Sequence, residues 1–388
     1  MTRRAFTPSA RGDLSTLDFM RALCTLVVVA AHFLGMTGHF PNVMGGLPRV
    51  AVLMFFVHTS FVLMLSLERQ EIQSPDKLWR RFMVRRFFRV YPLTTFVLAA
   101  ILVFRIPSQM VPPNFQSLHL GAAGIISNFL LTMNLTRSDP LLSPMWSLPY
   151  EFQLYFILPA LFLLVKRWRG AAPVFGLWCV TLALALVQPA IAYGGRLDIL
   201  EFAPCFVAGV LCYKLSKTVE PTMPFALWPL LLIPGLLLIF IFPPTPKNWP
   251  VAWIACFLMA ITVPFIRQTR NDLIRDLSHW IARHSFAIYL AHYFCLWFAF
   301  RTNHFFWPVQ WTIFIATNVL LPVAMYRLIE YPMIRLGTKL STAPSAAVHI
   351  VQERVQSCCA DSHSPPRLRS LSASASTACG SISERRVK

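Results

Sequence analysis

The chain has 388 residues and a formal net charge of +19, and 56% of its residues are hydrophobic while only 13% are charged. Its mean hydropathy is +0.56. A soluble protein of this length has too much surface to cover with so few charges, so the composition excludes that class. It predicts an all-α polytopic integral membrane protein.

The first segment, residues 1–13, is basic and polar. The apolar run that follows is neither short nor followed by a small-residue cleavage pattern, so it does not resemble a secretory signal peptide. We expect a cytoplasmic N-terminal segment followed by a retained first span.

The apolar runs predict about ten transmembrane helices and one short re-entrant or peripheral helix. The short helix is placed at residues 121–135, a brief run that contains Gly and Asn. If it were an eleventh span, the basic cluster KRWRG at 166–170 would lie outside, against the positive-inside rule. The predicted spans are 20–38, 50–66, 92–104, 149–165, 174–193, 199–213, 226–242, 250–268, 284–300 and 309–328.

This topology places both termini in the cytoplasm and 29 of the 35 Lys and Arg residues on the inner side. The basic charge is therefore explained by topology and by attraction to anionic membrane lipid, a stronger interpretation than nucleic-acid binding. No nucleic-acid partner is expected. The six basic residues on the outer side are Arg49, Arg105, Arg137, Arg196, Lys247 and Arg301.

Nine cysteines form no CxxC pair and no His/Cys cluster with metal-ligand spacing, so we expect neither a metal nor a bound cofactor. The Ser-, Ala- and Arg-rich stretch 341–388 has little to bury and is predicted to be a disordered cytoplasmic tail.

The opening span, "LDFMRALCTLVVVAAHF" at 17–33, carries Arg21 and His32 eleven residues apart. On a helix they lie within roughly 20° of one face and about 16 Å apart along the axis. Asp18 can pair with Arg21 at i,i+3 spacing. Intramembrane ionisable groups are usually functional, but a buried structural histidine above a snorkelling arginine is an equal alternative. His58 and His292 lie at similar predicted depth, so position alone does not choose among the histidines.

Five further stretches accompany this opening motif along residues 14–337: "FFVHTSFVLML" (55–65), "RRFFRVYPL" (85–93), "MWSLPYEFQLYFILPAL" (145–161), "HSFAIYLAHYF" (284–294) and "RLIEYPMIRLG" (327–337). Together they resemble the membrane-bound acyltransferase family 3, in which an Arg, ten residues and a His open the first span. His58-Thr59-Ser60 stands where that family usually shows Leu-Ser-Gly, which leaves a role for His58 open.

The resemblance implies a membrane acyltransferase domain over 14–337 that uses cytoplasmic acyl-CoA as co-substrate, with acetyl-CoA expected. The acceptor would be a carbohydrate or a lipid-linked glycan. A histidine suits removal of the acceptor hydroxyl proton, and the motif assigns that role to His32, with Arg21 as its catalytic companion. Asp18 and His292 are interpreted as structural support.

Arg86 and Arg89 lie three residues apart in the basic stretch, and guanidinium groups bind phosphate oxygens bidentately. Because this stretch matches the family's Arg-x-x-Arg, we favour donor binding over a cluster that only sets topology. Glu151 is the one acid in its predicted span. We place it near the outer end, farther out than His32, with acceptor binding and a structural role as equal alternatives.

Two other classes fit parts of the pattern. A transporter or flippase also needs many spans and polar groups at middle depth, but it would show repeat symmetry, which we do not see. A non-catalytic scaffold would need a large loop or an active tail. The expected location is a bacterial inner membrane, and the acyl group and acceptor are not determined by the sequence.

Overall fold

The structure is a computed structural model that describes residues 15–36, 41–73, 75–111, 114–191, 198–228, 249–302 and 305–342. The chain divides into two compact units, Met1–Ser341 and Thr342–Lys388. The predicted segment 1–13, most of the predicted span 226–242 and nearly all of the predicted tail lie outside the described residues.

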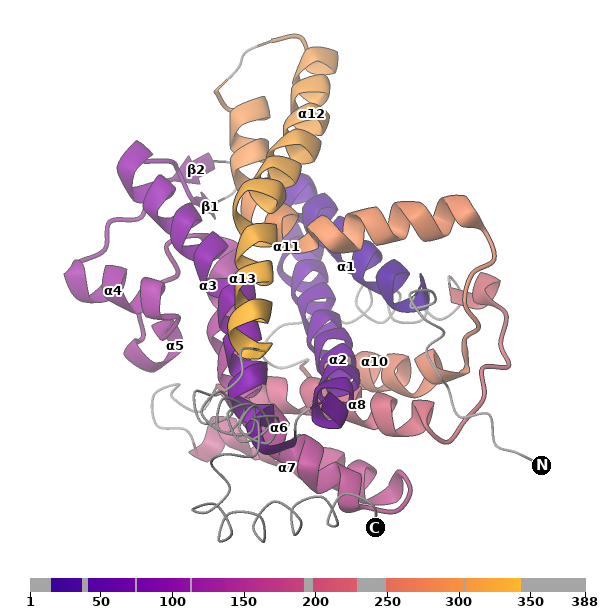
Figure 1. The fold of residues 1–388 in the computed structure, drawn as a ribbon. Coiled ribbons are helices and arrows are strands. Elements are labelled where there is room, and N and C mark those ends of the chain that lie inside the picture. Colours follow the sequence, from indigo (N-terminus) through magenta and orange to yellow (C-terminus); the bar gives the residue numbers. More distant parts are fainter. Residues whose placement is uncertain are drawn as a thin grey trace, which may run out of the picture. The chain divides into compact units, whose positions relative to one another are not determined.

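The described chain is built almost entirely from helices (Figure 1). One hairpin, β1 (Gln109–Val111) with β2 (Asn114–Gln116), pairs Gln109 with Gln116 in antiparallel register. The α-helices are α1 (Ser15–Met36), α2 (Pro41–Gln73), α3 (Leu78–Phe104), α4 (Ala122–Leu130), α5 (Met133–Thr136), α6 (Leu148–Arg167), α7 (Ala172–Ile191), α8 (Ile199–Ser216), α10 (Trp249–Thr262), α11 (Asp272–Phe300), α12 (Trp307–Met325) and α13 (Tyr331–Thr342). The shorter turns are η1 (Pro75–Lys77), η2 (Ser143–Ser147), η3 (Phe225–Leu227), η4 (Val263–Phe265) and the π-helical η5 (Tyr326–Glu330).

Several helices have the length and apolar composition to cross a membrane. Among the described residues, six helical stretches qualify, and two shorter apolar stretches, 172–188 and 250–265, accompany them. The class of a helical membrane protein therefore agrees with the sequence, whereas the count of ten spans stays a prediction. The six stretches are Ser15–Met36, Gly46–Gln73, Pro75–Phe104, Ser143–Arg167, Ile199–Ser216 and Trp307–Thr342.

Residues 121–135 form short helices, in agreement with the predicted short re-entrant or peripheral helix. They form α4 and α5, and the nine residues of α4 are only about 14 Å long, less than half of a hydrocarbon core. Buried Asn128 holds this segment in place: its amide donates to the carbonyl oxygens of Gly124 and Asp139. The backbone N–H of Leu141 donates to the Asn128 amide oxygen at 2.7 Å.

The helix predicted to begin at residue 92 is longer than expected. α3 begins at Leu78 and continues through Pro92, so the basic stretch belongs to the helix and not to a loop. Leu78, Phe82 and Val90 are buried along one side of it, and this apolar stripe keeps the added turns folded against the protein. The predicted start at residue 92 was too late, because proline usually ends or kinks a helix and Pro92 was therefore placed at the helix start.

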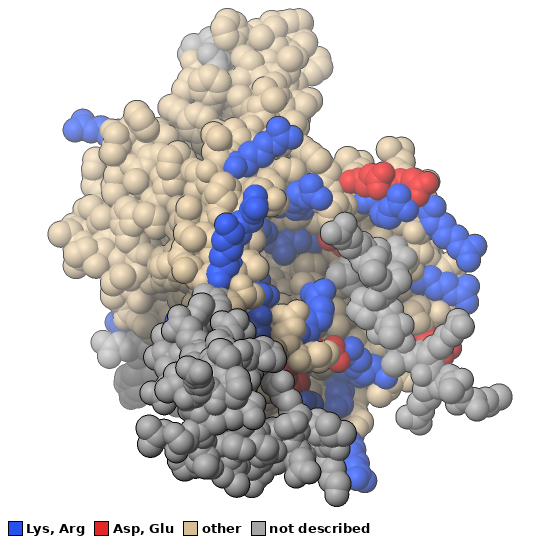
Figure 2. Space-filling view, in the orientation of Figure 1, with Lys and Arg blue, Asp and Glu red and all other residues tan. Residues whose placement is uncertain are grey.

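Helices α1, α2 and α11 form the centre of the fold. α1 packs against both α2 and α11, α2 packs against α8, and α12 packs against α11. Figure 2 shows Lys and Arg side chains gathered in and around a hollow of this face, whereas the surface over α12 and over α3–α5 carries almost no charge. The almost uncharged region is the kind of surface that contacts lipid.

Candidate active site

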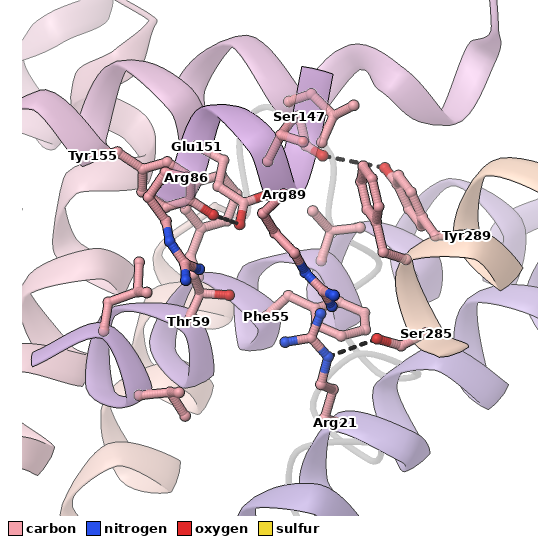
Figure 3. A pocket seen from close by; sticks show the side chains of 17 residues that line it. Arg21, Phe55, Thr59, Arg86, Arg89, Ser147, Glu151, Tyr155, Ser285 and Tyr289 are labelled. Carbon is pink, nitrogen blue, oxygen red and sulfur yellow. Dashed lines mark hydrogen bonds between the residues drawn. The ribbon is translucent and has the colours of Figure 1, made fainter. Parts of the chain in front are cut away.

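A cavity of about 100 Å³ lies where α1, α2, α3, α6 and α11 approach one another. Its polar walls include Arg21, Arg86, Arg89 and Glu151, whose side chains point toward a common space in Figure 3. Five separate segments of the sequence thus supply one site. Its guanidinium groups outnumber its carboxylates, so the cavity favours an anionic ligand.

Arg21 is held by α11. Its Nε–H donates to the Ser285 hydroxyl oxygen at 2.6 Å. Ser285 donates its own hydroxyl proton to the carbonyl of Ala282 at 2.9 Å, which leaves its oxygen lone pairs facing Arg21. The guanidinium of Arg21 is thereby fixed at the wall of the cavity.

Arg89 and Arg86 lie one turn apart on α3 but have different surroundings. Arg89 forms an ion pair with Glu330, whose side chain is buried in η5. The Nε of Arg86 is buried and has no hydrogen-bond partner within the described part of the chain. An unmet buried donor is costly, and a ligand oxygen in the cavity would satisfy it.

Glu151 occupies a different place from the one predicted. It lines the same cavity as Arg21 and accepts a hydrogen bond from the Tyr155 hydroxyl, so the prediction that it lies farther out than His32 is wrong. The reason is the start of its helix: η2 lies against α11, where Tyr289 donates to the carbonyl of Pro144 and contacts Ser147. α6 therefore begins inside the protein beside α11.

His32 faces α11 like Arg21, which confirms that the two side chains share one face of α1. Its Nδ1 lies 3.1 Å from Nε2 of His292. His292 is fully buried, whereas His32 is partly exposed. Neither histidine lines the arginine cavity; Ser285 and His292 are two turns apart on α11, about 10 Å along its axis.

The predicted pair between Asp18 and Arg21 does not form. Its carboxylate lies 2.8 Å from Nδ1 of His279 on α11, and the other nitrogen of His279 is 2.7 Å from Arg283. The i,i+3 spacing permitted the predicted pair, but Arg21 turns into the cavity toward Ser285, and Asp18 reaches across to α11 instead. Asp18 still supports the packing of α1 on α11.

His58 is buried on α2, and its Nδ1 has no hydrogen-bond partner among the residues described. It does not line the arginine cavity. No group of three His, Cys, Asp or Glu side chains in the described ranges could hold a metal ion.

Sequence reasoning missed four side chains of the site: Tyr155, Ser285, Tyr289 and Glu330. Each lies inside one of the quoted motif stretches, so the motifs contained the signal. Their roles depend on contacts between distant segments, which spacing along one helix does not reveal.

Comparison with known proteins relates this chain to acyltransferases. The family model described as "Acyltransferase domain" matches residues 14–327. A peptidoglycan O-acetyltransferase, OatA of Listeria monocytogenes, is 22% identical over 365 residues, which cover 85% of this chain and 57% of that protein. Acyltransferase MdmB of Streptomyces mycarofaciens is 29% identical over 147 residues, 36% of this chain and 34% of that protein.

The chain thus matches between about one third and three fifths of the length of these curated relatives. No solved structure matches it.

Proposed function

The chain belongs to the acyltransferase family whose model matches residues 14–327, and from that premise we propose that it is a membrane O-acyltransferase. It transfers an acyl group, acetyl in the simplest case, from acyl-CoA to a hydroxyl of a carbohydrate or a lipid-linked glycan. The observation that carries this proposal is a cavity with three arginines two helical turns from a paired, partly exposed histidine.

The arginine cavity is proposed to hold the anionic part of the donor. Arg21 and Arg89 are already oriented by Ser285 and Glu330, so little side-chain freedom is lost when a phosphate binds. Arg86 offers its unmet Nε–H donor. Guanidinium groups bind phosphate by charge-assisted, often bidentate hydrogen bonds, which favours a nucleotide-linked donor such as acyl-CoA.

His32 is proposed to be the general base. The acceptor oxygen attacks the thioester carbonyl carbon while its proton moves to His32, and the C–O bond forms. The C–S bond then breaks, and the proton on His32 passes to the departing CoA thiolate. The separation of about 10 Å along α11 between the Arg21 and His32 contacts suits a donor whose phosphates and thioester are joined by a long arm.

The acceptor and the location are proposed from a relative and from the donor. A relative that matches most of this chain bears the name of a peptidoglycan O-acetyltransferase, which supports a cell-envelope glycan as acceptor. We place the protein in a bacterial inner membrane with both termini in the cytoplasm, where acyl-CoA is made. The surrounding lipid is then its third partner.

The test compares His32→Ala with the wild-type protein, both purified into lipid nanodiscs. The probes are radiolabelled acetyl-CoA as donor and a bacterial lipid-linked glycan extract as acceptor. We expect label transfer to fall by at least about 100-fold, the usual contribution of a general base, while the Kd for acetyl-CoA stays unchanged.

Full transfer by His32→Ala would refute the mechanism and direct attention to His58. Movement of the glycan across the membrane without acetyl-CoA would instead support the transporter alternative.

A further inference from the structure

His292 has both ring nitrogens occupied. Its Nδ1 lies 2.8 Å from the carbonyl oxygen of Tyr289 and 3.2 Å from that of Ile288. A carbonyl oxygen can only accept, so Nδ1 of His292 carries a proton. In the neutral imidazole the other nitrogen, Nε2, then carries a lone pair and acts as an acceptor.

That acceptor faces His32. Because Nε2 of His292 accepts, the 3.1 Å contact requires a proton on Nδ1 of His32. The backbone of Val28, one turn earlier on α1, also forms a hydrogen bond with the His32 ring. Nε2 of His32 is then the unprotonated nitrogen, the one able to remove a proton.

We propose that His292 is a positioning residue: it holds His32 in the Nδ1–H tautomer and keeps its Nε2 lone pair open toward the acceptor hydroxyl. This inference rests on the proposed base role of His32. It assigns the base role to His32, which is partly exposed, and the positioning role to His292, which is fully buried and has no free nitrogen.

Tyr293 fixes the orientation of the pair. Its ring meets His32 edge to face at 4.9 Å and His292 edge to face at 5.1 Å between centroids. The two imidazoles are themselves tilted by 32°, with centroids 5.0 Å apart. The Tyr293 ring thus packs on both imidazoles and limits rotation of His32 away from its partner.

The histidine pair also determines where the proton of the acceptor hydroxyl is held during the reaction. When Nε2 of His32 takes the acceptor proton, the imidazolium donates its Nδ1–H to a neutral acceptor, Nε2 of His292. A shift of that Nδ1 proton to Nε2 of His292 would reverse the direction of the contact but would leave the proton on Nε2 of His32 in place. The proton is therefore held at His32 Nε2, next to the reacting groups, until the CoA thiolate takes it back.

The first test reads the tautomer directly. Protein with 15N-labelled histidine in nanodiscs is studied by NMR, and the His32 signals are identified by their absence in His32→Ala. We expect Nδ1 to be protonated and Nε2 unprotonated in both His32 and His292 of the wild type. A proton on Nε2 of His32 in the neutral wild-type protein would overturn the proposal.

The second test uses His292→Phe and His292→Gln. The Phe variant removes the acceptor at Nε2 of His292, so the Nδ1–H fraction of His32 should fall, and kcat should drop about 10- to 100-fold with an unchanged acetyl-CoA Kd. The Gln variant places a side-chain carbonyl oxygen near the former position of Nε2. It should therefore recover part of the Nδ1–H fraction of His32 and part of kcat. The control is His284→Phe, a buried histidine on the same helix whose Nδ1 lies 2.8 Å from the Trp280 carbonyl.

Unchanged kcat and tautomer in His292→Phe, while His32→Ala is inactive, would overturn the positioning role alone. Full activity of His32→Ala would remove the base that His292 is proposed to position, and the proposed function would fail with it. A drop in His284→Phe equal to that in His292→Phe would indicate a general packing effect and would also count against the proposal.

Discussion

Arg86 and Arg89 belong to one motif, but their surroundings predict different effects of substitution. The buried Nε of Arg86 lacks a partner among the described residues, whereas Arg89 neutralises buried Glu330. Removing Arg86 therefore takes away a ligand contact, and removing Arg89 also leaves a buried carboxylate without its counter-ion.

We expect Arg86→Ala to raise the Kd for acetyl-CoA at least about tenfold with little change in stability, because a hydrogen bond to a charged group contributes about 1.5–3 kcal/mol. Arg86→Lys should recover only part of the affinity for acetyl-CoA, since lysine restores the charge but not the bidentate guanidinium group. Arg89→Ala should lower the free energy of unfolding by about 3–5 kcal/mol. Calorimetric titration and thermal unfolding of the purified variants measure both quantities.

The matched control is Arg80→Ala, which removes one exposed arginine from the same helix and lies outside the cavity. An equal loss of affinity in Arg80→Ala would show that net charge, not the cavity, attracts the donor.

At the residue scale, four side chains singled out from the sequence come together in the structure, whereas the partner predicted for Asp18 does not hold. Arg21, Arg86, Arg89 and Glu151 do meet in one cavity. The partner of Asp18 was wrong, because i,i+3 spacing describes one helix, while the contact that forms crosses to His279 on another.

At the scale of elements, the crossing of α2 and α8 depends on Gly209. A Cβ built at Gly209 would lie 1.9 Å from the Ser60 hydroxyl oxygen and 2.2 Å from the backbone carbonyl oxygen of Val57. The backbone atom cannot move aside cheaply, so the two helices approach this closely only with glycine at this position. Ser60 also lies in the His58-Thr59-Ser60 departure from the family pattern, and it retains the small residue that the contact needs.

Gly209→Ala should therefore destabilise the protein by about 1–3 kcal/mol, the usual range for overpacking a close contact. Gly176→Ala on α7 is the control, because a Cβ at Gly176 meets nothing within 4 Å, and alanine favours a helix. Thermal unfolding in detergent measures both. An unchanged Tm in Gly209→Ala would show that α2 and α8 can move apart without loss of stability, which would contradict the prediction.

Element boundaries were the least predictable feature. Pro92 and the basic residues concealed the first turns of α3, which burial of Leu78 and Phe82 stabilises. The π-helical η5 that places Glu330 beside Arg89 has no simple sequence signature. By contrast, the short helix predicted at 121–135 agrees with α4, because Asn and Gly in a brief apolar run weaken a transmembrane assignment.

For the whole molecule, the contacts agree with the predicted sidedness. The ion pairs Glu71–Lys166 and Glu68–Lys217, both at 2.7 Å, join segments that were all assigned to the inner side. Met223, in another inner segment, forms a bridge with Ile266 near the inner end of the predicted span 250–268. On the predicted outer side, the Ser108 hydroxyl donates to the carbonyl of Leu141. Charge asymmetry along the sequence predicts which of these two sides faces the cytoplasm.

Single cysteines introduced into the chain and treated with a membrane-impermeant thiol reagent test the topology. The outer positions should react on intact cells, and the inner positions only after permeabilisation, because the reagent does not cross the bilayer. The parent protein without added cysteines gives the background; its exposed Cys179 lies in the apolar helix α7 and should not react. The outer positions are Met110, Arg196 and Lys247, and the inner ones are Pro75, Trp168, Ser216 and Arg270.

Trp168 is the decisive position, because it follows α6 directly and its sidedness depends on whether 121–135 crosses. If the two short helices there do not cross, α3 and α6 are joined on the predicted outer side, and Trp168 returns to the predicted inner side. Labelling of Trp168→Cys from outside, with Met110→Cys also reacting from outside, would require an additional crossing between them. It would also move the lysine and arginine residues of 166–170 to the outer face, against the charge asymmetry from which the orientation was inferred.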